Sequence, residues 1–316
     1  MRKKRFLVTG GTGFIGSNIC KYLVEQNYPV KIYDNNSRGE IKKIANIKNK
    51  VKFIKGDIRD KKLLSKSLRN TDAVIHLAYV NGTKYFYSNP VKVLEIAVKG
   101  IVNVIDGCIK NKIKELYLAS SSEVYQSPKK IPTSEKESLK IPNIYNPRFS
   151  YGGGKILTEL MGIHYGKKYF KKLIIFRPHN VYGPNMGYEH VVPEFIKRFT
   201  KLKKNKKTFE IKGNGNETRS FIYIDDFITA FDLILKRGKH LNIYNIGTNE
   251  EVKISQLVSK LSKLFNKKIV LKKTKIDAGS TKRRCPDIKK IKKLGFKQKF
   301  KLTKGLKKIL LTKNYK

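Results

Sequence analysis

Tyr151 and Lys155 stand four positions apart, and their side chains are the first candidates for chemistry in this chain. Residues at i and i+4 of a helix share one face, so the phenol and the ammonium are expected to lie together. A phenol with a pKa of about 10 is a poor base at neutral pH. Because a neighbouring ammonium favours the phenolate, Tyr151 is a candidate general base for a substrate hydroxyl. This spacing also arises by chance in exposed helices, so further residues must support the role.

A second group of polar side chains, Ser120-Ser121-Ser122-Glu123, follows the apolar residues 116–119. Those apolar residues are predicted to form a buried strand. Polar residues directly after the strands of a parallel sheet lie in the crevice where ligands bind. The Ser121 hydroxyl can hold a substrate oxygen while the Tyr151 phenolate takes its proton. The sequence therefore predicts a proton-transfer site made from the end of one strand and the start of one helix.

The N-terminal segment contains every part of a dinucleotide-binding unit in order. Apolar residues 6–8 predict a strand, glycines at positions 10, 13 and 16 follow, and a helical pattern begins at Phe14. The glycines allow the backbone to approach a pyrophosphate, which the N–H groups of the helix would bind. A second strand, residues 30–33, leads to Asp34, whose carboxylate can accept hydrogen bonds from an adenosine ribose and repels a 2′-phosphate. We therefore expect NAD rather than NADP, with Arg38 close enough in sequence to leave NADP open.

Strand and helix signals alternate along the first half of the chain, which is typical of βαβ units and a parallel sheet covered on both faces. After about Arg177, prolines, glycines and polar loops separate shorter elements. The predicted fold is α/β: a Rossmann-type doubly wound parallel sheet in residues 1–176 and a smaller C-terminal α/β substrate-binding lobe in residues 177–316, with some segments able to return to the first domain. The predicted strands are residues 6–8, 30–33, 51–54, 73–77, 116–119 and 173–176; the predicted helices include 91–111 and 151–169, and 287–316 is predicted to hold a Lys-rich helix, a turn at Gly295 and a closing amphipathic helix.

Charge is the most unusual feature of the composition, since 70 Lys and Arg residues stand against 24 Asp and Glu residues, a formal net charge of +46. The lysines are spread from Lys3 to Lys316 without a nucleic-acid-binding motif, so a solvated basic surface is favoured over a dedicated nucleic-acid site. Such a field would still steer phosphate-bearing substrates towards the protein. Cys20, Cys108 and Cys285 lack disulfide or metal-site spacing, which indicates a reducing cytoplasm and no metal. The basic N-terminus does not continue as a signal peptide, and no apolar run is long enough to span a membrane.

With these motifs in place, the chain resembles the extended short-chain dehydrogenase/reductase family, in its branch of NAD-dependent nucleotide-sugar epimerases and dehydratases. The resemblance extends over essentially the whole length. The residues that carry it are Gly10-x-x-Gly13-x-x-Gly16, Asp34, Asp57, His76-Leu77-Ala78, Ser121, Tyr151-x-x-x-Lys155 and the segments 177–184, 219–226 and 283–287.

The resemblance implies an enzyme that oxidises a nucleotide sugar transiently at C4, passes the hydride to NAD and recycles the cofactor. Tyr151 would remove the O4 proton, Ser121 would polarise the same oxygen, and Lys155 would tune Tyr151. The implied cofactor contacts are Gly10, Gly13, Phe14, Ile15, Gly16, Asp34, Asp57 at the adenine, Ile58, Leu77, Ala78, Tyr151 and Lys155. The implied contacts with the nucleotide-diphosphate sugar are Ser122, Asn180, Arg219 and Arg284.

Glu123 separates the chemistries of this family. The resemblance links an acidic residue at this place to 4,6-dehydratases and sugar-acid decarboxylases, whereas simple 4-epimerases more often have a small or hydroxyl residue. Once C4 is a ketone, the C5 proton becomes acidic, and a carboxylate can remove it, which allows loss of water from C6 or inversion at C5. Alternatively, Glu123 only positions the substrate. Dehydratases of the dTDP-glucose type carry Asp-Glu where this chain has Ser122-Glu123, so the acid for departure of the C6 hydroxide stays unassigned.

Three departures from the family pattern lie near the candidate base. Tyr79 replaces the second alanine of the usual His-Leu-Ala-Ala, and Ala97 stands where many relatives have asparagine. Residues 152–154 are all glycine, which costs about 1 kcal/mol each in a helix relative to alanine. We expect close packing or a close backbone approach to compensate at these glycines, and we expect Tyr79 to narrow the pocket.

Three other functions stay open at this point. A UDP-glucuronate-type decarboxylase resembles this chain in Ser-Glu-Val-Tyr at 122–125 and in Arg-Arg-x-Pro-Asp at 283–287. A net NAD(P)-dependent sugar-nucleotide oxidoreductase would release its reduced cofactor. A cofactor-binding but non-catalytic regulator, for example of RNA, would need neither Ser121 nor Tyr151. By the same resemblance, a homodimer formed through helices 91–111 and 151–169 is expected.

Overall fold

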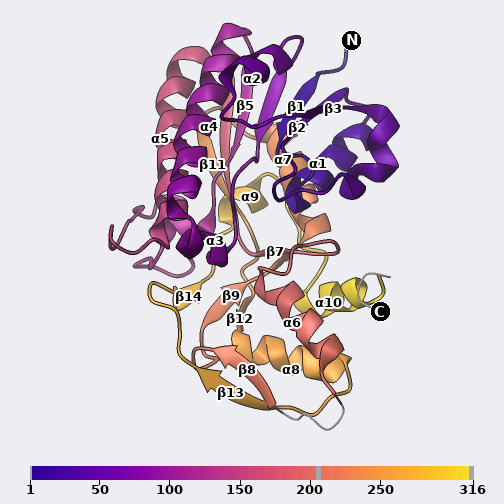
Figure 1. The fold of residues 1–316 in the computed structure, drawn as a ribbon, viewed down its shortest axis with the longest axis vertical. Helices are drawn as coiled ribbons and strands as arrows, with labels where there is room; N and C mark the ends of the chain where they lie inside the picture. Colours follow the sequence, from indigo (N-terminus) through magenta and orange to yellow (C-terminus); the bar gives the residue numbers. More distant parts are fainter. Residues whose placement is uncertain (1, 204–207, 313–316) are drawn as a thin grey trace. The chain divides into compact units, whose positions relative to one another are not determined.

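The computed structural model describes residues 2–203 and 208–312. Met1, at the start of the predicted domain 1–176, and residues 313–316, at the end of the predicted segment 287–316, lie outside the described residues. Within the described part, a seven-stranded sheet has the order β11-β6-β5-β4-β1-β2-β3, and every pair from β3 to β6 is parallel (Figure 1). The strands are β1 (Phe6–Thr9), β2 (Val30–Asp34), β3 (Val51–Lys55), β4 (Ala73–His76), β5 (Glu115–Ala119), β6 (Lys172–Pro178) and β11 (Asn242–Ile246).

The α/β class and the Rossmann-type sheet are confirmed. Six strands coincide with predicted segments to within one or two residues at each end. The buried strands β1, β4, β5 and β6 contain continuous apolar runs that are visible in the sequence, whereas a lysine interrupts the apolar residues of β2 and of β3. The chain starts in the middle of the sheet and proceeds first to β3 at one edge; it then returns beyond β1 to β4. The strand order therefore reverses between β1 and β4, which is where ligands bind in open sheets of this kind.

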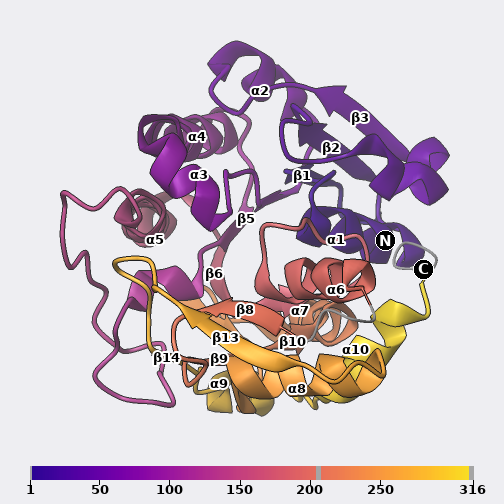
Figure 2. The ribbon, with the colours of Figure 1, turned by 60° about the horizontal axis from the view of Figure 1, so that its bottom comes forward.

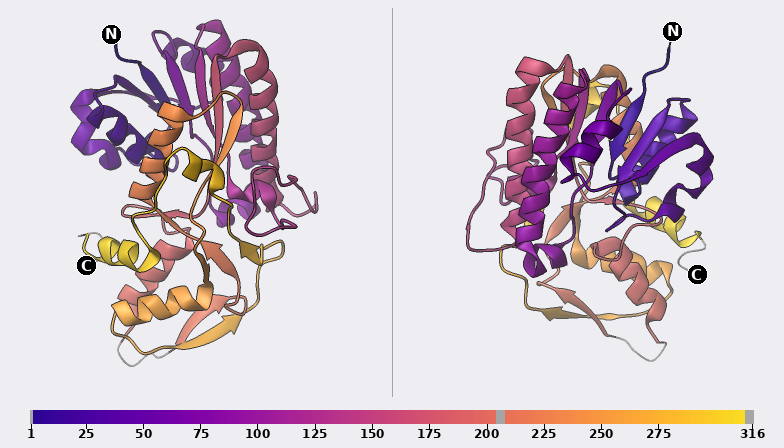
Figure 3. Two further views of the ribbon diagram at one scale, coloured as in Figure 1. Left: turned by 180° about the vertical axis from the view of Figure 1, so that it is seen from behind. Right: turned by 45° about the horizontal axis from the view of Figure 1, so that its top comes forward.

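Helices cover both faces of this sheet. The long helices α4 (Pro90–Lys110) and α5 (Phe149–Tyr169) pack side by side on one face, and α1 (Phe14–Glu25) lies on the opposite face (Figures 2 and 3). Shorter elements follow single strands: η1 (Ile41–Lys50), α2 (Lys61–Ser67), α3 (Thr83–Ser88) and η2 (Ser122–Tyr125). The predicted helices at 91–111 and 151–169 are α4 and α5, each displaced by at most two residues at its ends.

The chain divides into two compact units. The first comprises residues 1–124, 139–177 and 232–244, and the second comprises residues 125–138, 178–231 and the chain from Asn245 onward. The first unit thus receives a late segment, residues 232–244, which supplies the first part of β11. The second unit receives an early segment, residues 125–138.

The second unit is built from short strands and helices. The described pairs are β7 with β10, β8 with β13, and a three-stranded sheet β12-β9-β14. The predicted end of the chain is confirmed within the described residues: a short Lys-rich helix α9, a positive φ of 105° at Gly295, and the helix α10. The elements are β7 (Val181–Tyr182), α6 (Val191–Lys201), β8 (Thr208–Lys212), β9 (Thr218–Ser220), β10 (Ile222–Tyr223), α7 (Ile224–Arg237, shared with the first unit), β12 (Glu251–Lys253), α8 (Ile254–Leu264), β13 (Val270–Thr274), β14 (Arg283–Arg284), α9 (Lys289–Lys293) and α10 (Leu302–Leu310).

Glycines allow α4 and α5 to lie close to their neighbours. A methyl group on Gly100 of α4 would come within 2.4 Å of the Ile58 side chain, and one on Gly162 of α5 within 2.6 Å of the Leu118 side chain. These contacts fix α5 directly over β5. No helix among the described residues is long and apolar enough to cross a membrane.

Candidate active site and cofactor loop

The glycine-rich loop after β1 packs its backbone against the end of β4. Gly10 has φ of +74°, and its N–H donates to the Tyr33 carbonyl at 2.9 Å. A Cβ on Gly10 would lie 2.7 Å from the backbone nitrogen of Ala78, and a Cβ on Gly16 would lie 2.1 Å from the Gly10 carbonyl oxygen. Since backbone atoms cannot move aside, both positions require glycine. The first N–H groups of α1 have no acceptor within their own helix, so the loop presents free donors of the kind that bind a pyrophosphate.

Asp34 ends β2 and is buried, with 8% of its surface exposed. One carboxylate oxygen accepts the N–H of Thr12 at 3.0 Å, and the other accepts the N–H of Asn36 at 2.8 Å. The carboxylate therefore connects the glycine-rich loop to the loop after β2 and keeps lone pairs for a further donor. The Arg38 guanidinium, which left NADP open in the sequence analysis, lies over the Tyr85 ring, 4.2 Å from its centre.

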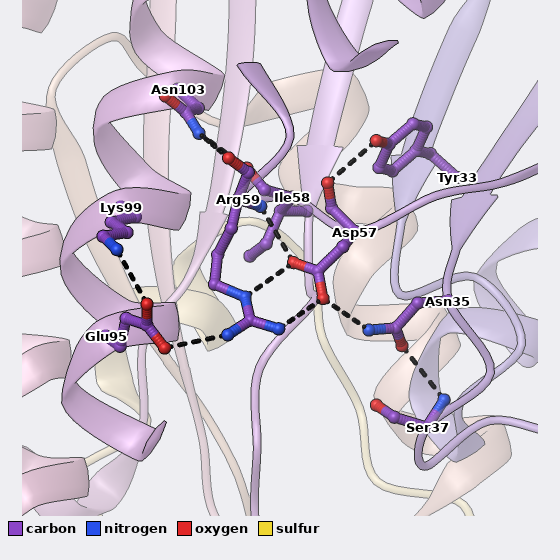
Figure 4. A network of polar contacts seen from close by, with 9 residues as sticks. All are labelled: Tyr33, Asn35, Ser37, Asp57, Ile58, Arg59, Glu95, Lys99 and Asn103. Carbon is purple, nitrogen blue, oxygen red and sulfur yellow. Dashed lines mark hydrogen bonds and ion pairs between the residues drawn. The ribbon is translucent and has the colours of Figure 1, made fainter. Parts of the chain in front are cut away.

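Asp57, which follows β3, is the centre of a closed network (Figure 4). Its first oxygen accepts from the N–H and Nε of Arg59 at 2.9 and 3.0 Å, and its second accepts from Arg59 Nη2 and Asn35 Nδ2, each at 2.9 Å. The hydrogen bonds to Arg59 are the largest influence that lowers the pKa of Asp57, to about 2. Arg59 also binds Glu95 of α4 at 2.8 Å, and Glu95 in turn accepts from Lys99. The network therefore ties the β3–α2 loop to α4.

Tyr151 and Lys155 lie on one face of α5, as the sequence predicted. Tyr151 is buried, with 5% of its surface exposed, and its ring stacks on Phe86 at 4.7 Å between centroids. The Lys155 ammonium lies 5.9 Å from the centre of the Tyr151 ring and donates to the Ala119 carbonyl at 2.7 Å. Burial lowers the pKa of Lys155 to about 7, against a smaller upward influence of Glu159.

Ser121 and Glu123 form a second local pair, in the turn that follows β5. Ser121 is buried, and its hydroxyl oxygen accepts the N–H of Glu123 at 3.1 Å. The Glu123 carboxylate is part-buried and lies 3.9 Å from the Arg148 guanidinium. Ser122, between them, is 4% exposed. The hydroxyls of Ser121 and Ser122 and the carboxylate of Glu123 therefore lie together in the short turn that follows β5.

Two hydrogen bonds connect α5 to the end of β5. They bring the Tyr151–Lys155 pair on α5 and the Ser121–Glu123 pair after β5 to the same end of that strand. Lys155 binds the carbonyl of Ala119, and the Ser120 hydroxyl donates to Glu159. The Glu159 carboxylate also accepts two hydrogen bonds from the buried Arg177 guanidinium, one from Nε at 2.8 Å and one from Nη2 at 2.5 Å. Glu159 was not among the predicted site residues, although its position four residues after Lys155 places it on the same helix face as the catalytic candidates.

The residues predicted to bind the substrate nucleotide gather around one strand of the second unit. Arg219 on β9 and Arg284 on β14 are register partners in a parallel pair. Asn180 donates its amide to the carbonyl of Ser220, also on β9, at 2.9 Å. The Arg219 guanidinium donates to the Thr218 carbonyl at 2.8 Å, and the Arg284 guanidinium donates to the Thr281 hydroxyl at 2.8 Å. Among the described residues, no group of three or more His, Cys, Asp or Glu side chains is placed to hold a metal ion.

Residues 6–247 match the family model described as the NAD dependent epimerase/dehydratase family. The chain belongs to this family. It is an enzyme family whose cofactor is NAD, and the glycine-rich loop fits such a cofactor because a Cβ at Gly10 or Gly16 would collide with backbone atoms. In an NAD-dependent enzyme of this fold, the loop after β1 holds the pyrophosphate.

Relatives within the family carry out several reactions. A dTDP-D-glucose 4,6-dehydratase of Dictyostelium discoideum is 32% identical over 274 residues, which is 82% of this chain and 61% of the relative. A putative UDP-glucose 4-epimerase of Methanocaldococcus jannaschii is 34% identical and covers 96% of both chains. A UDP-N-acetyl-alpha-D-glucosaminuronate decarboxylase of Bacillus cytotoxicus is 30% identical over 83% of this chain and 80% of the relative. The chain thus spans less than two thirds of the Dictyostelium protein.

Solved structures agree with this assignment. A UDP-glucose 4-epimerase of Thermotoga maritima with UDP-glucose matches with a TM-score of 0.87 at 27% identity and covers 97% of both chains. A double mutant of a dTDP-glucose 4,6-dehydratase of Streptomyces venezuelae, solved with NAD, matches with a TM-score of 0.87 at 25% identity, over 97% of this chain and 95% of that one. The epimerase/dehydratase family therefore shares the whole fold of this chain.

Proposed function

We propose that this member of the epimerase/dehydratase family acts on a nucleotide-diphosphate sugar and oxidises it transiently at C4. The observation that carries the proposal is the attachment of α5 to the end of β5. Lys155 binds the carbonyl that precedes Ser120, and Ser120 binds Glu159 of the same helix. A base, a cation, a hydroxyl and a carboxylate are therefore held on two elements that cannot move independently.

In the proposed reaction, Tyr151 takes the proton of the sugar O4 hydroxyl. Ser121 donates a hydrogen bond to the same oxygen, and the positive charge of Lys155 stabilises the phenolate of Tyr151. NAD, held by the glycine-rich loop after β1, would supply the acceptor and later the donor of the hydride. Because Tyr151 is buried, little water competes for the proton that it takes up. When the hydride returns to C4, as in an epimerisation, Tyr151 returns its proton to O4; in a dehydration the ketone at C4 remains.

Glu123 is the proposed base for the second proton. A ketone at C4 acidifies the proton on C5, the carboxylate removes it, and the C6 hydroxyl leaves with a proton as water. The hydride then returns to C6 and a proton returns to C5, so the ketone at C4 remains. The Arg148 guanidinium, 3.9 Å from Glu123, attracts the carboxylate and holds it at the end of the 3₁₀ turn. This chemistry makes the enzyme a dehydratase, and hence a lyase; with Glu123 as a positioning residue only, inversion at C4 would make it an isomerase.

The cofactor contacts are proposed from the loop geometry and the family resemblance. The backbone of Gly10, Gly13, Phe14, Ile15 and Gly16 would bind the pyrophosphate, and Asp34 the adenosine ribose. Leu77 and Ala78 would lie beside the cofactor, and Tyr151 and Lys155 would approach the nicotinamide ribose. Asp57 and Ile58 would contact the adenine, although all four hydrogen bonds to the Asp57 carboxylate come from the protein itself.

The substrate's nucleotide diphosphate is proposed to bind in the second unit. Arg219 and Arg284 lie in register on β9 and β14, and Asn180 is bonded to the same strand. Guanidinium groups bind phosphate as planar forks, so a neighbouring pair suits a diphosphate. Ser122 would contact the sugar.

A decarboxylase is the second candidate. A decarboxylase relative is 30% identical to this chain, and a carboxylate at Glu123 suits both reactions. A ketone at C4 would allow a C6 carboxylate to leave as carbon dioxide. The two candidates differ in the atoms that the product has lost.

The test is to incubate the purified protein with UDP-, GDP-, CDP- and dTDP-sugars and to record product masses. Loss of one water supports the dehydratase, and loss of carbon dioxide supports the decarboxylase. An unchanged mass with a new retention time supports an epimerase. Continuous formation of NADH would contradict a recycled cofactor, and the absence of any product would contradict the proposed function.

We also propose a homodimer formed through α4 and α5. Val91, Leu94 and Val98 lie on one stripe of α4 and are 75%, 43% and 43% exposed, and Leu160 of α5 is 54% exposed. Exposed apolar stripes on two packed helices suit burial against a second copy. Light scattering should give twice the monomer mass, and Leu160→Glu should shift it towards the monomer. A cytoplasmic location is proposed as well, supported by three free, buried cysteines.

A further inference from the structure

We infer that Tyr79 is a positioning residue for Lys155: its ring holds the buried ammonium in place for the proposed proton transfer. Tyr79 follows β4, two residues after Leu77. Its ring centre lies 3.9 Å from the Lys155 nitrogen, whereas the Tyr151 ring centre lies 5.9 Å away. The cation therefore lies closer to the aromatic face of Tyr79 than to that of Tyr151. The inference rests on the proposed function for its activity measurement.

The ammonium of Lys155 has few other partners. Among the described residues, the Ala119 carbonyl is its one hydrogen-bond acceptor, although an ammonium can donate three hydrogen bonds. Lys155 is 3% exposed, so bulk water has little access to its ammonium. An aromatic face attracts a cation most strongly where both are shielded from water. The Tyr79 ring thus compensates for part of the solvation that Lys155 loses.

The other titratable groups that face Lys155 do not replace this contact. Glu159, one turn further along α5, is engaged by Arg177 and Ser120. Burial lowers the pKa of His76, on β4, to about 3, so His76 is neutral near pH 7. Tyr151 lies farther from the ammonium than Tyr79 does. Burial also raises the pKa of Tyr79 well above its ordinary value, so the cation faces a neutral phenol.

The hydroxyl of Tyr79 fixes the orientation of the ring. It is buried and has no hydrogen-bond partner within the part of the chain that the structure describes. A Cβ on Gly154 would lie 2.0 Å from this hydroxyl and 2.6 Å from the Ala97 methyl. The hydroxyl therefore occupies space that Gly154 leaves free beside Ala97, between α5 and α4. In this position it cannot act as an acid or base on a substrate. The ring centres of Tyr79 and Tyr151 lie 5.1 Å apart, with the two ring planes nearly perpendicular.

The test compares Tyr79→Leu with Tyr79→Phe in the full-length protein. Leucine fills similar volume without an aromatic face, so the pKa of Lys155 should fall and the alkaline limb of the kcat profile should move to lower pH by about one unit. Phenylalanine keeps the face and should restore the wild-type limb, with kcat within about threefold. Phe86→Leu is the matched control, because Phe86 also stacks on Tyr151. It should not move the alkaline limb.

Each other result has a defined meaning. A Tyr79→Phe enzyme as impaired as Tyr79→Leu would overturn the inference, because the hydroxyl would then be the acting group. The inference is also wrong if Tyr79→Leu leaves the limb in place, or if Phe86→Leu moves it equally. Thermal unfolding of each variant checks the fold. If the wild-type protein converts no sugar nucleotide, the proposed function fails, and the inference about Tyr79 needs a different measurement. The pKa of Lys155 is then followed by NMR titration of the lysine side chains, and Lys155→Gln assigns the Lys155 signal.

Discussion

Two polar regions of the first unit, one partly exposed and one buried, differ in how many of their hydrogen-bonding groups have partners. Around Asp57, each carboxylate oxygen accepts two hydrogen bonds, and Arg59 continues the network to α4. Near Tyr151, the buried hydroxyl of Tyr79 has no partner among the described residues, and the Lys155 ammonium relies on one carbonyl and an aromatic ring. Native proteins satisfy most buried polar groups, so an incomplete cluster needs a reason. The complete network supports the fold, whereas the incomplete cluster leaves Lys155 with donors that a ligand could use.

The largest expected effect tests the incomplete cluster directly. Tyr151→Phe should lower turnover by about 10²- to 10⁴-fold, because the proposed base loses its hydroxyl. Its affinity for NAD, measured by titration calorimetry, should change little. Tyr165→Phe, at an exposed position of the same helix, is the matched control. Turnover retained by Tyr151→Phe would remove Tyr151 from the role of base.

The next effect concerns cofactor choice. Asp34→Ala should narrow the preference for NAD over NADP by about 10- to 100-fold, because a charged acceptor near the proposed ribose site is lost. The measurement is the pair of dissociation constants. Asp60→Ala, which removes the side-chain cap of α2 at Leu63, should lower stability without changing that preference. Equal affinities for NAD and NADP in the native protein would contradict the role of Asp34.

A third test asks whether the packing beneath Tyr79 is as tight as the distances indicate. Gly154→Ala should lower the free energy of unfolding by about 1–3 kcal/mol, because its methyl would meet the Tyr79 hydroxyl and the Ala97 methyl. Gly153→Ala is the control, since its methyl would meet only the movable Ile141 side chain, at 3.2 Å. That change should be neutral or stabilising by up to about 1 kcal/mol.

A combined variant sharpens this result. Adding Tyr79→Phe and Ala97→Gly to Gly154→Ala removes both colliding atoms, and the nearest remaining ring carbon lies 3.4 Å away. Thermal unfolding should therefore recover part of the lost stability. If Gly154→Ala alone is as stable as the native protein, the close packing of the Tyr79 hydroxyl against Gly154 is contradicted.

The smallest effect tests the complete network through pH. The pKa of Asp57 is lowered to about 2 in the folded protein, below its ordinary 3.8. Its stabilising contribution is therefore fully present above pH 4 and is lost as the pH falls through 2. Asp57→Asn should make unfolding less dependent on pH over that range, by less than about 1 kcal/mol because the pair is partly exposed. Denaturant unfolding at pH 6 and pH 3 measures the difference, and an unchanged pH dependence would contradict it.

The sequence was most informative where structure depends on neighbouring residues. Short apolar segments predicted six strands, and the spacing of Tyr151 and Lys155 predicted their common face. The expectation that close packing compensates for a glycine in α5 is confirmed at Gly154. Only the structure identified the compensating atoms, because Tyr79, Ala97 and Gly154 come together through tertiary packing.

Other parts of the site depended on contacts that no local pattern encodes. The four donors to Asp57 come from two different loops. Glu159 accepts hydrogen bonds from Ser120, which follows β5, and from Arg177 on β6. The seventh strand was also not predicted as part of the sheet. Its residues, Asn242–Ile246, follow a helix in the irregular half of the chain, and only pairing with β6 assigns them to the sheet.

That last strand has a consequence for synthesis on the ribosome. The chain emerges from its N-terminus, so β1 to β6 can assemble while residues beyond 178 are still being made. Until residue 246 has left the exit tunnel, β6 is an edge strand with unpaired backbone groups. A nascent chain of this protein therefore exposes an aggregation-prone edge for the whole time needed to translate the residues between β6 and β11, which is when a chaperone would protect it.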